Sequence, residues 1–278
     1  MKEFKDKVAV ITGAASGIGR GIAERCVQEG MKVVLADVEE AALAQTEQEL
    51  RATHATVLAV QTDVSRASDI EALAQKTLKA FGAVHLLVNN AGVGAGSSIW
   101  ESTLADWEWV MGVNLWGVIH GLRIFVPIML AQATEGHIVN TASIAGLLPY
   151  HPGAPYQVTK HGVVALSEQL YYSLAQRNAK VKVSVLCPGW VNTRIMDSER
   201  NRPSQLQNEP SNLPMGPEQE AIMQSMREEA QAGLSPRQVS DHVFNAIRNE
   251  QFYILTNPEL NSMIQQRMEN ILQQRNPA

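Results

Sequence analysis

Short runs of residues rich in Val, Ile and Leu alternate along this chain with longer segments of helical periodicity. Strands that are apolar along their whole length are buried on both faces, as in a parallel sheet covered by helices. The predicted strands are Val8–Thr12, Lys32–Ala36, Thr56–Gln61, Leu86–Asn89, His137–Thr141, Val181–Cys187 and Phe252–Thr256. The predicted helices are Gly17–Glu29, Glu39–Ala52, Ser68–Phe81, Leu104–Ala131, Pro155–Gln176, Glu218–Ala230 and Ser235–Asn249. With right-handed crossovers, this order predicts an α/β fold built on a doubly wound parallel sheet of about seven strands.

The whole chain, residues 1–278, is predicted to form a single domain, because the first two thirds alternate regularly between strands and helices without an interdomain linker. The regular pattern breaks at Arg194, where a stretch rich in Pro, Asn, Ser and Gln begins. We expect a segment at about 194–234 to cover the substrate, since long connections in compact domains are usually functional. A tolerated surface insertion is the alternative. Apolar residues at helical spacing predict a final amphipathic helix at about 257–273, which packs on the body or, less favourably, on a neighbouring subunit.

Composition excludes several classes of protein. With 45% apolar and 18% charged residues, the chain has enough apolar surface to fold. Its net charge of −5 and its lack of a Lys or Arg run argue against nucleic acid or an anionic membrane surface as partner. Cys26 and Cys187 are far apart in apolar segments, which is typical of reduced core residues. The charged N-terminus lacks a secretory signal, and no apolar stretch reaches the ~18 residues of a spanning helix, so we expect a cytoplasmic protein with a small-molecule ligand.

A glycine-rich turn lies between the first predicted strand and the first predicted helix. Gly13, Gly17 and Gly19 permit a tight turn, and the helix that follows offers free N–H groups to a pyrophosphate. Asp37 ends the second predicted strand, where a carboxylate can accept hydrogen bonds from the adenosine ribose. A structural turn and an ordinary helix cap are the alternatives. Together the two features predict a Rossmann-type dinucleotide site.

Five motifs in order make the chain similar to the classical short-chain dehydrogenase/reductase family. They are the turn Gly13-x-x-x-Gly17-x-Gly19, Asn89-Asn-Ala-Gly92, Ser143, Tyr156-x-x-x-Lys160 and Pro188-Gly189. The resemblance extends from about Lys5 to Thr193 and implies a nicotinamide-dependent oxidoreductase. Thr159 stands where Ser is commoner, and the segment after Arg194 leaves the substrate undefined.

The tyrosine and lysine can be interpreted chemically without the family. A tyrosine of ordinary pKa near 10 is a poor base at neutral pH unless a cation and hydrogen bonds assist it. Lys160 lies one helical turn after Tyr156, on the same helix face, and can supply that cation. Ser143 can donate a hydrogen bond to the substrate oxygen while Tyr156 exchanges a proton with it. Taken singly, a solvated helix face and a turn-forming serine are the alternatives.

The resemblance implies further site residues. It adds Asn114 to the catalytic group Ser143, Tyr156 and Lys160, as the residue that holds a water linking Lys160 to solvent; a buried structural amide is the alternative. The cofactor-binding residues that it implies are Gly13, Ser16, Gly17, Ile18, Gly19, Asp37, Asp63, Val64, Asn90, Ala91, Gly92, Tyr156, Lys160, Pro188, Gly189, Val191 and Thr193. His151 borders the substrate or is a surface residue, and Trp109 is assigned to core or interface packing. The seven histidines show no metal-ligand spacing, so no metal is expected.

The sequence thus predicts reversible hydride transfer between NAD(H) and a secondary alcohol or ketone. NADP is the less favoured cofactor, because Asp37 would repel its 2′-phosphate. Apolar residues on each side of the site (Ile195, Met196, Leu206, Leu213, Met215, Leu147, Leu148, Pro149 and Pro155) favour a bulky apolar or aromatic substrate. The alternatives are a catalytically silent cofactor sensor and an isomerase or dehydratase of the same family. By analogy with that family we expect a homo-oligomer, either a tetramer or a dimer.

Overall fold

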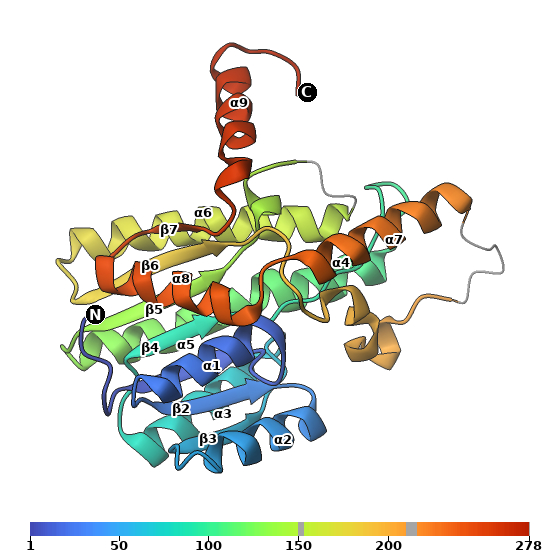
Figure 1. Cartoon of the computed structure of the whole chain (residues 1–278). Helices are drawn as coiled ribbons and strands as arrows, with labels where there is room; N and C mark the ends of the chain where they lie inside the picture. Colours follow the sequence, from blue (N-terminus) through green and yellow to red (C-terminus); the bar gives the residue numbers. More distant parts are fainter. Residues whose placement is uncertain (150–152, 210–215, 278) are drawn as a thin grey trace.

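A single parallel sheet of seven strands forms the centre of the molecule (Figure 1). The structure is a computed structural model, and it describes residues 1–149, 153–209 and 216–277. The strands are β1 (Val8–Thr12), β2 (Lys32–Asp37), β3 (Val57–Gln61), β4 (Leu86–Asn89), β5 (Gly136–Thr141), β6 (Val181–Cys187) and β7 (Tyr253–Leu255). Their order in the sheet is β3-β2-β1-β4-β5-β6-β7. The predicted doubly wound fold is confirmed.

The strands β1 to β3 extend the sheet in one direction, and those from β4 onward extend it from β1 in the opposite direction. Strand β1 pairs with β2 on one side and with β4 on the other, and both pairings are parallel. In open α/β sheets, ligands bind beyond the carboxyl ends of the strands where the order reverses. The loops after β1 and β4 therefore border the place where a ligand is expected.

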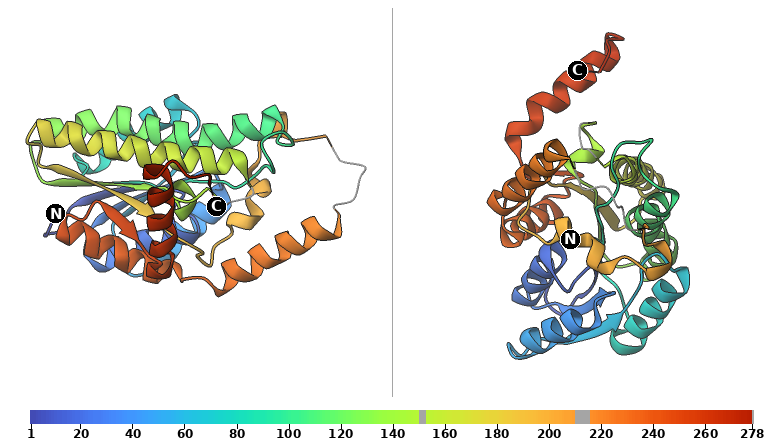
Figure 2. Two further views of the ribbon diagram at one scale, coloured as in Figure 1. Left: turned by 90° about the horizontal axis from the view of Figure 1, so that it is seen from above. Right: turned by 90° about the vertical axis from the view of Figure 1, so that its right-hand side faces the viewer.

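Helices cover both faces of the sheet, as the left-hand view of Figure 2 shows. Apolar side chains of α1, α2 and α8 form one buried cluster with the sheet, and those of α3, α5 and α6 form a second cluster on the opposite face. The helices are α1 (Gly17–Gln28), α2 (Glu40–Arg51), α3 (Ala67–Phe81), α4 (Leu104–Met111), α5 (Gly117–Ala131), α6 (Ala154–Gln176), α7 (Pro217–Ala232), α8 (Pro236–Asn249) and α9 (Asn261–Leu272). This two-sided burial explains why the strands are apolar along their length.

Local signals in the sequence fix several helix ends. Ser235 caps α8 in a reciprocal capping box with Gln238, and Pro236 occupies the first helical position. Thr103 and Asp106 form the same arrangement at the start of α4. These contacts satisfy N–H groups that a helix start would otherwise leave without partners.

The predicted helix Leu104–Ala131 is interrupted at its centre. A π-helical turn, Gly112–Trp116, separates α4 from α5. By length and composition alone, the helical run Leu104–Ala131 is a candidate membrane span, which the search for uninterrupted apolar stretches did not identify. In the structure this run packs against α3 and α6 in the helical layer of one sheet face.

The tail differs most from expectation. The predicted amphipathic helix exists as α9, but it extends away from the body in both figures instead of packing on it. Met263, Met268, Ile271 and Leu272 are exposed along it. The favoured packing on the body is therefore wrong, since the preceding turn Pro258–Leu260 directs the chain outward. Packing on a neighbouring subunit stays a prediction.

Candidate active site

A cavity of about 1570 Å³ opens at the carboxyl edge of the sheet. Residues that follow β1, β2, β3, β4, β5 and β6 line it. The predicted site residues among the lining are Gly13, Ser16, Gly17, Ile18, Asp37, Asp63, Val64, Asn90, Ala91, Gly92, Ser143, Tyr156, Lys160, Pro188, Gly189, Val191 and Thr193. The structure thus brings all the predicted catalytic and cofactor-binding residues except Gly19 and Asn114 to the lining of one cavity. His151 lies outside the described residues.

The glycine turn is too crowded for side chains. A Cβ on Gly19 would lie 2.1 Å from the Gly13 carbonyl oxygen, and Gly13 itself has a φ of +65°. A Cβ on Gly17, where φ is +53°, would lie 3.0 Å from Thr193. Glycine is required here because the turn is left-handed and because α1 approaches β1 closely. Ser16, the residue before α1, makes no side-chain cap, so the start of the helix faces the cavity uncapped.

Two acidic residues follow β2 and β3. Asp37 accepts hydrogen bonds from the backbone N–H groups of Ala15, at 2.9 Å, and Glu39, at 3.0 Å. Burial raises the pKa of Asp37, and these hydrogen bonds act in the opposite direction. Asp63 accepts from the Ser65 hydroxyl at 2.7 Å, beside the buried Val64. Both carboxyl groups are held by local turns at the edge of the cavity.

The segment after β4 is tied to the glycine turn. The N–H groups of Asn90 and Ala91 donate to the Thr12 hydroxyl at 2.9 and 3.1 Å. The Asn90 amide donates to the Thr12 carbonyl at 3.0 Å. Asn90 and Ala91 therefore hold β1 and β4 together where the sheet reverses its order.

Ser143, Tyr156 and Lys160 lie together in the wall of the cavity. Ser143 lies two residues after β5, and its hydroxyl accepts from the Ala145 N–H at 3.1 Å. Burial raises the pKa of Tyr156, and a hydrogen bond with Ser143 partly offsets this effect. The Lys160 ammonium lies 5.4 Å from the centre of the Tyr156 ring and donates to the Thr141 carbonyl at 3.0 Å. Burial lowers the pKa of Lys160 to about 8.

Asn114 lies in the π-helical turn between α4 and α5. Its amide oxygen accepts from the Val93 N–H at 2.8 Å, and its amide nitrogen donates to the Val93 carbonyl at 2.9 Å. A Cβ on Gly92 would lie 3.5 Å from both the Asn114 amide oxygen and the Lys160 ammonium nitrogen. Asn114 is thus close to Lys160, although it does not line the cavity itself. The amide nitrogen also donates to the hydroxyl of Thr159, the residue that departs from the family pattern.

The segment after β6 is fixed on both sides. The Pro188 carbonyl accepts from the Ile144 N–H at 2.8 Å. The Gly189 N–H donates to the Asn257 side chain at 3.1 Å, and a Cβ on Gly189 would collide with that side chain. Asn257 lies 68 residues later in the chain, so no local pattern signalled its role.

Comparison with known proteins decides the family. A family model described as short chain dehydrogenase matches residues 7–204. The chain is 37% identical over 278 residues to a CLA biosynthesis dehydrogenase/reductase of Lactiplantibacillus plantarum, which covers 98% of this chain and 95% of that protein. This chain belongs to the short-chain dehydrogenase/reductase family. The predicted resemblance is confirmed.

Two further proteins resemble the chain over nearly its whole length. The C alpha-dehydrogenase of a Sphingobium species is 32% identical over 273 residues, covering 98% of this chain and 87% of that protein. The crystal structure of a short-chain dehydrogenase/reductase from Burkholderia phymatum in complex with NAD has a TM-score of 0.96 and 49% identity, covering 100% of this chain and 98% of that chain. Members of the family bind nicotinamide cofactors, which confirms the predicted class of cofactor.

The predicted substrate wall of this short-chain dehydrogenase/reductase is partly wrong. Leu147, Leu148, Pro149 and Pro155 do not line the cavity, because Leu147 and Leu148 turn into the core and Pro155 packs against Gly96. The wall next to Tyr156 is instead apolar: it consists of Val93, Ala95, Trp109, Val113 and Leu206, and the fully buried Val110 packs in the same cluster without lining the cavity. Ile195, Met196 and Leu206 line the cavity as predicted, together with Ile222, Met223 and Met226 of α7. Leu213 and Met215 lie outside the described residues.

The buried ammonium of Lys160 generates a test by stability. Its pKa falls from an ordinary 10.5 to about 8, so between these pH values the unfolded chain binds more protons than the folded chain. Below pH 8 the penalty for burying the charge is constant, and it disappears as pH rises toward 10.5. As pH rises from about 8 to 10.5, we expect the free energy of unfolding of the wild type to increase by up to about 3 kcal/mol relative to that of Lys160→Met. Urea titrations of both proteins at several pH values measure this difference. If the two unfolding free energies change with pH in parallel, the lowered pKa of Lys160 is contradicted.

Proposed function

We propose that the protein transfers hydride reversibly between NAD(H) and a secondary alcohol or ketone, with Tyr156 as general acid and base. The observation that carries this proposal is the meeting of Tyr156, Ser143 and Lys160 in the same cavity as the uncapped start of α1. A silent cofactor sensor needs no such group of titratable side chains. The second candidate is an isomerase or dehydratase. Net turnover of added cofactor distinguishes the two, because only the oxidoreductase consumes the cofactor.

The residues present fit a dinucleotide. The turn from Gly13 to Gly19 leaves no space for Cβ atoms, so its backbone is open to a close approach by a pyrophosphate. Asp37 faces the cavity where it can accept from the adenosine ribose, and the segment from Pro188 to Thr193 would hold the nicotinamide end. When bound, the nicotinamide accepts or supplies the hydride.

The protein's own contribution is control of one proton. In oxidation, Tyr156 takes the proton of the substrate hydroxyl, while Ser143 donates a hydrogen bond to the same oxygen and positions it. In reduction, Tyr156 returns the proton to the carbonyl oxygen. Lys160 supplies positive charge near the Tyr156 ring, and Asn114 lies close to Lys160, held in place by two hydrogen bonds to the Val93 backbone. We infer that Lys160 favours the ionised form of Tyr156, and that Asn114 holds a water through which protons pass between Lys160 and solvent.

The charges around Asp37 favour NAD over NADP. A 2′-phosphate at this position would meet two carboxylates, those of Asp37 and Glu39. Arg20 is engaged by Glu24 at 2.9 Å and by Glu49 at 2.5 Å, and Arg200 is engaged by Glu39 at 2.7 Å. The nearby cations therefore already have carboxylate partners.

The apolar cluster beside Tyr156 favours a bulky apolar or aromatic substrate. Val93, Trp109 and Leu206 offer few hydrogen-bond partners, so buried sugar-like hydroxyl groups would lose their water without replacement. We further expect a cytoplasmic homotetramer formed through α5 and α6; Trp116, immediately before α5, and Val158, in α6, are exposed.

Tyr156→Phe tests the mechanism. The variant keeps the ring and loses the transferable proton, so we expect turnover to fall by roughly 10²–10⁴-fold with NADH binding nearly unchanged. Tyr172→Phe removes a hydroxyl from the same helix at a site 66% exposed, and it serves as the matched control. Near-normal turnover in Tyr156→Phe would contradict the mechanism.

The cofactor preference is measured by kcat/KM for NAD and NADP at saturating alcohol. Like charges brought together cost several kcal/mol, so we expect NAD to be preferred by at least about tenfold. Asp37→Asn should narrow that difference. A wild type that prefers NADP refutes the assignment.

The substrate class is tested with a panel of alcohols. We expect cyclohexanol and 1-phenylethanol to give higher kcat/KM than glycerol or sorbitol, because the wall near Tyr156 is apolar. The absorbance of NADH reports each reaction. Polyols that outperform the apolar alcohols would show the class to be wrong.

A further inference from the structure

A strap of chain crosses the cavity. We define the strap as residues Ile195–Leu206, which include the short 3₁₀ segments Ile195–Asn201 and Ser204–Leu206. In the right-hand view of Figure 2 it lies between the N-terminal βα units and α4. Its residues line the same cavity as the glycine turn, so the strap forms one wall of the cofactor site.

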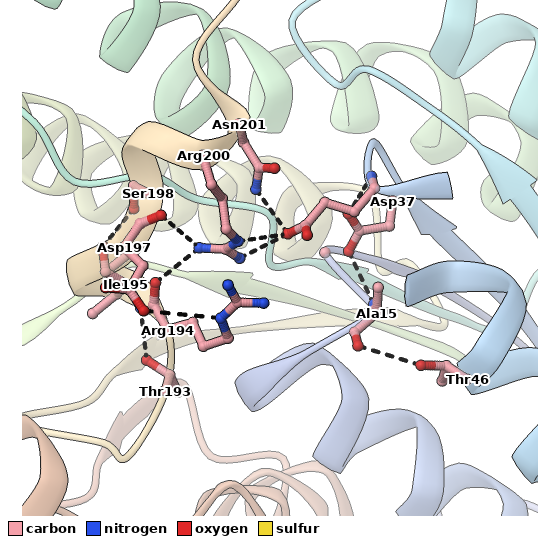
Figure 3. A network of polar contacts seen from close by, with 12 residues as sticks. Ala15, Asp37, Thr46, Thr193, Arg194, Ile195, Asp197, Ser198, Arg200 and Asn201 are labelled. Atoms are coloured by element: carbon pink, nitrogen blue, oxygen red, sulfur yellow. Dashed lines mark hydrogen bonds and ion pairs between the residues drawn. The ribbon is translucent and has the colours of Figure 1, made fainter. Parts of the chain in front are cut away.

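One side of the strap is fastened to the N-terminal side of the cavity. The Arg200 guanidinium contacts one carboxylate oxygen of Glu39 through two nitrogens, at 2.7 and 3.0 Å. The Asn201 amide donates to the same oxygen at 2.9 Å. The third guanidinium nitrogen donates to the carbonyls of Arg194 and Asp197, so it stiffens the strap itself. Figure 3 shows Arg200 and Asn201 pointing toward the side of the cleft that carries Asp37.

The other side of the strap is fastened across the cavity to α4. The Arg202 guanidinium forms an ion pair with Asp106 at 2.8 Å and stacks on the Trp109 ring, 5.1 Å from its centre. Asn208 donates to the same Asp106 carboxylate at 2.9 Å. The two arginines are two residues apart and reach opposite sides of the cavity.

These two fastenings differ in burial. The side chains of Arg202 and Asp106 are 2% and 7% exposed, whereas those of Arg200 and Glu39 are 24% and 23% exposed. Breaking a buried pair leaves uncompensated charge in the interior, but water can solvate the separated partners of a partly exposed pair. Of these two ion pairs, the one between Arg200 and Glu39 is therefore the easier to separate.

Glu39 also connects the strap to the predicted ribose site. Its N–H donates to the Asp37 carboxylate at 3.0 Å, so the two acidic residues form one turn at the end of β2. Although burial raises the pKa of Glu39, the hydrogen bonds from Arg200 and Asn201 hold it below its ordinary value. The carboxylate is thus ionised and paired at neutral pH, next to the residue expected to hold the adenosine.

We propose that Glu39 and Arg200 are positioning residues that retain the cofactor, because their ion pair fastens the strap over the adenosine side and opens when the cofactor enters or leaves. This inference rests on the proposed binding of NAD(H) in the cavity. It assigns to the pair a role in the release of cofactor, separate from the proton transfer at Tyr156.

The release of NADH tests the pair. In stopped-flow displacement by excess NAD, followed by NADH fluorescence, we expect E39Q and R200Q each to release NADH about fivefold to tenfold faster than the wild type. The double variant should release it no faster than either single variant, because both changes break one interaction. E40Q makes the same charge change one residue away, at an exposed side chain, and should match the wild type.

Digestion with trypsin tests the strap without cofactor. Cleavage after Arg200 requires this residue to leave Glu39, so E39Q should be cut there about fivefold faster than E40Q, as mass spectrometry of the fragments reports. R200Q serves for the release measurement if E39Q fails to fold.

Equal release rates in E39Q and E40Q would overturn the proposal. Additive effects in the double variant would overturn it as well, because they would indicate separate contacts with the cofactor. If the wild type does not bind NADH, the proposed function fails and the retention role fails with it. Faster cleavage of E39Q in that case would still show that the pair fastens the strap.

Discussion

All seven strands run in parallel, and this one constraint determines where the chemistry can lie. Parallel strands end at the same edge of the sheet, so residues that follow successive strands meet there although they are far apart in sequence. The glycine turn follows β1, Asp37 ends β2, Asn90 follows β4 and Ser143 follows β5. Because Thr12 and Asn90 join the loops of β1 and β4, the reversal of strand order becomes a rigid cradle instead of an open gap.

The cradle and the titratable residues make opposite demands on the interior. The glycine turn needs close packing, while burial elsewhere in the cavity wall raises the pKa of Tyr156 and lowers that of Lys160 to about 8. Both shifts disfavour charge, while proton transfer by a tyrosine needs charge to be available. The hydrogen bond of Ser143 and the carbonyl of Thr141 are the polar groups that moderate this cost. Burial of these two titratable side chains thus lowers the stability of the fold at the site where we propose that proton transfer occurs.

Local patterns predicted much of the fold and of the site. Apolar strands, the glycine turn and the Tyr156 to Lys160 spacing are encoded over a few residues, and the structure brings them together as expected. Contacts between distant segments could not be predicted in this way. Arg200 meets Glu39 across 161 residues, and the apolar wall beside Tyr156 comes from α4 and the segment after β4 instead of Leu147 to Pro149. The outward course of α9 depends on a turn whose direction no periodicity specifies.

In the proposed function, such distant contacts in the strap divide one cavity between two ligands. Arg202 and Asp106 hold the strap against α4, on the side where the apolar wall would meet a substrate. Arg200 and Glu39 hold it beside Asp37, on the side where the adenosine would lie. Because the second pair is the more exposed, water competes with it more effectively. In our proposal the adenosine side therefore opens while the apolar wall keeps its shape, so a cofactor that leaves after each turnover exchanges without dismantling the surface proposed to bind the substrate.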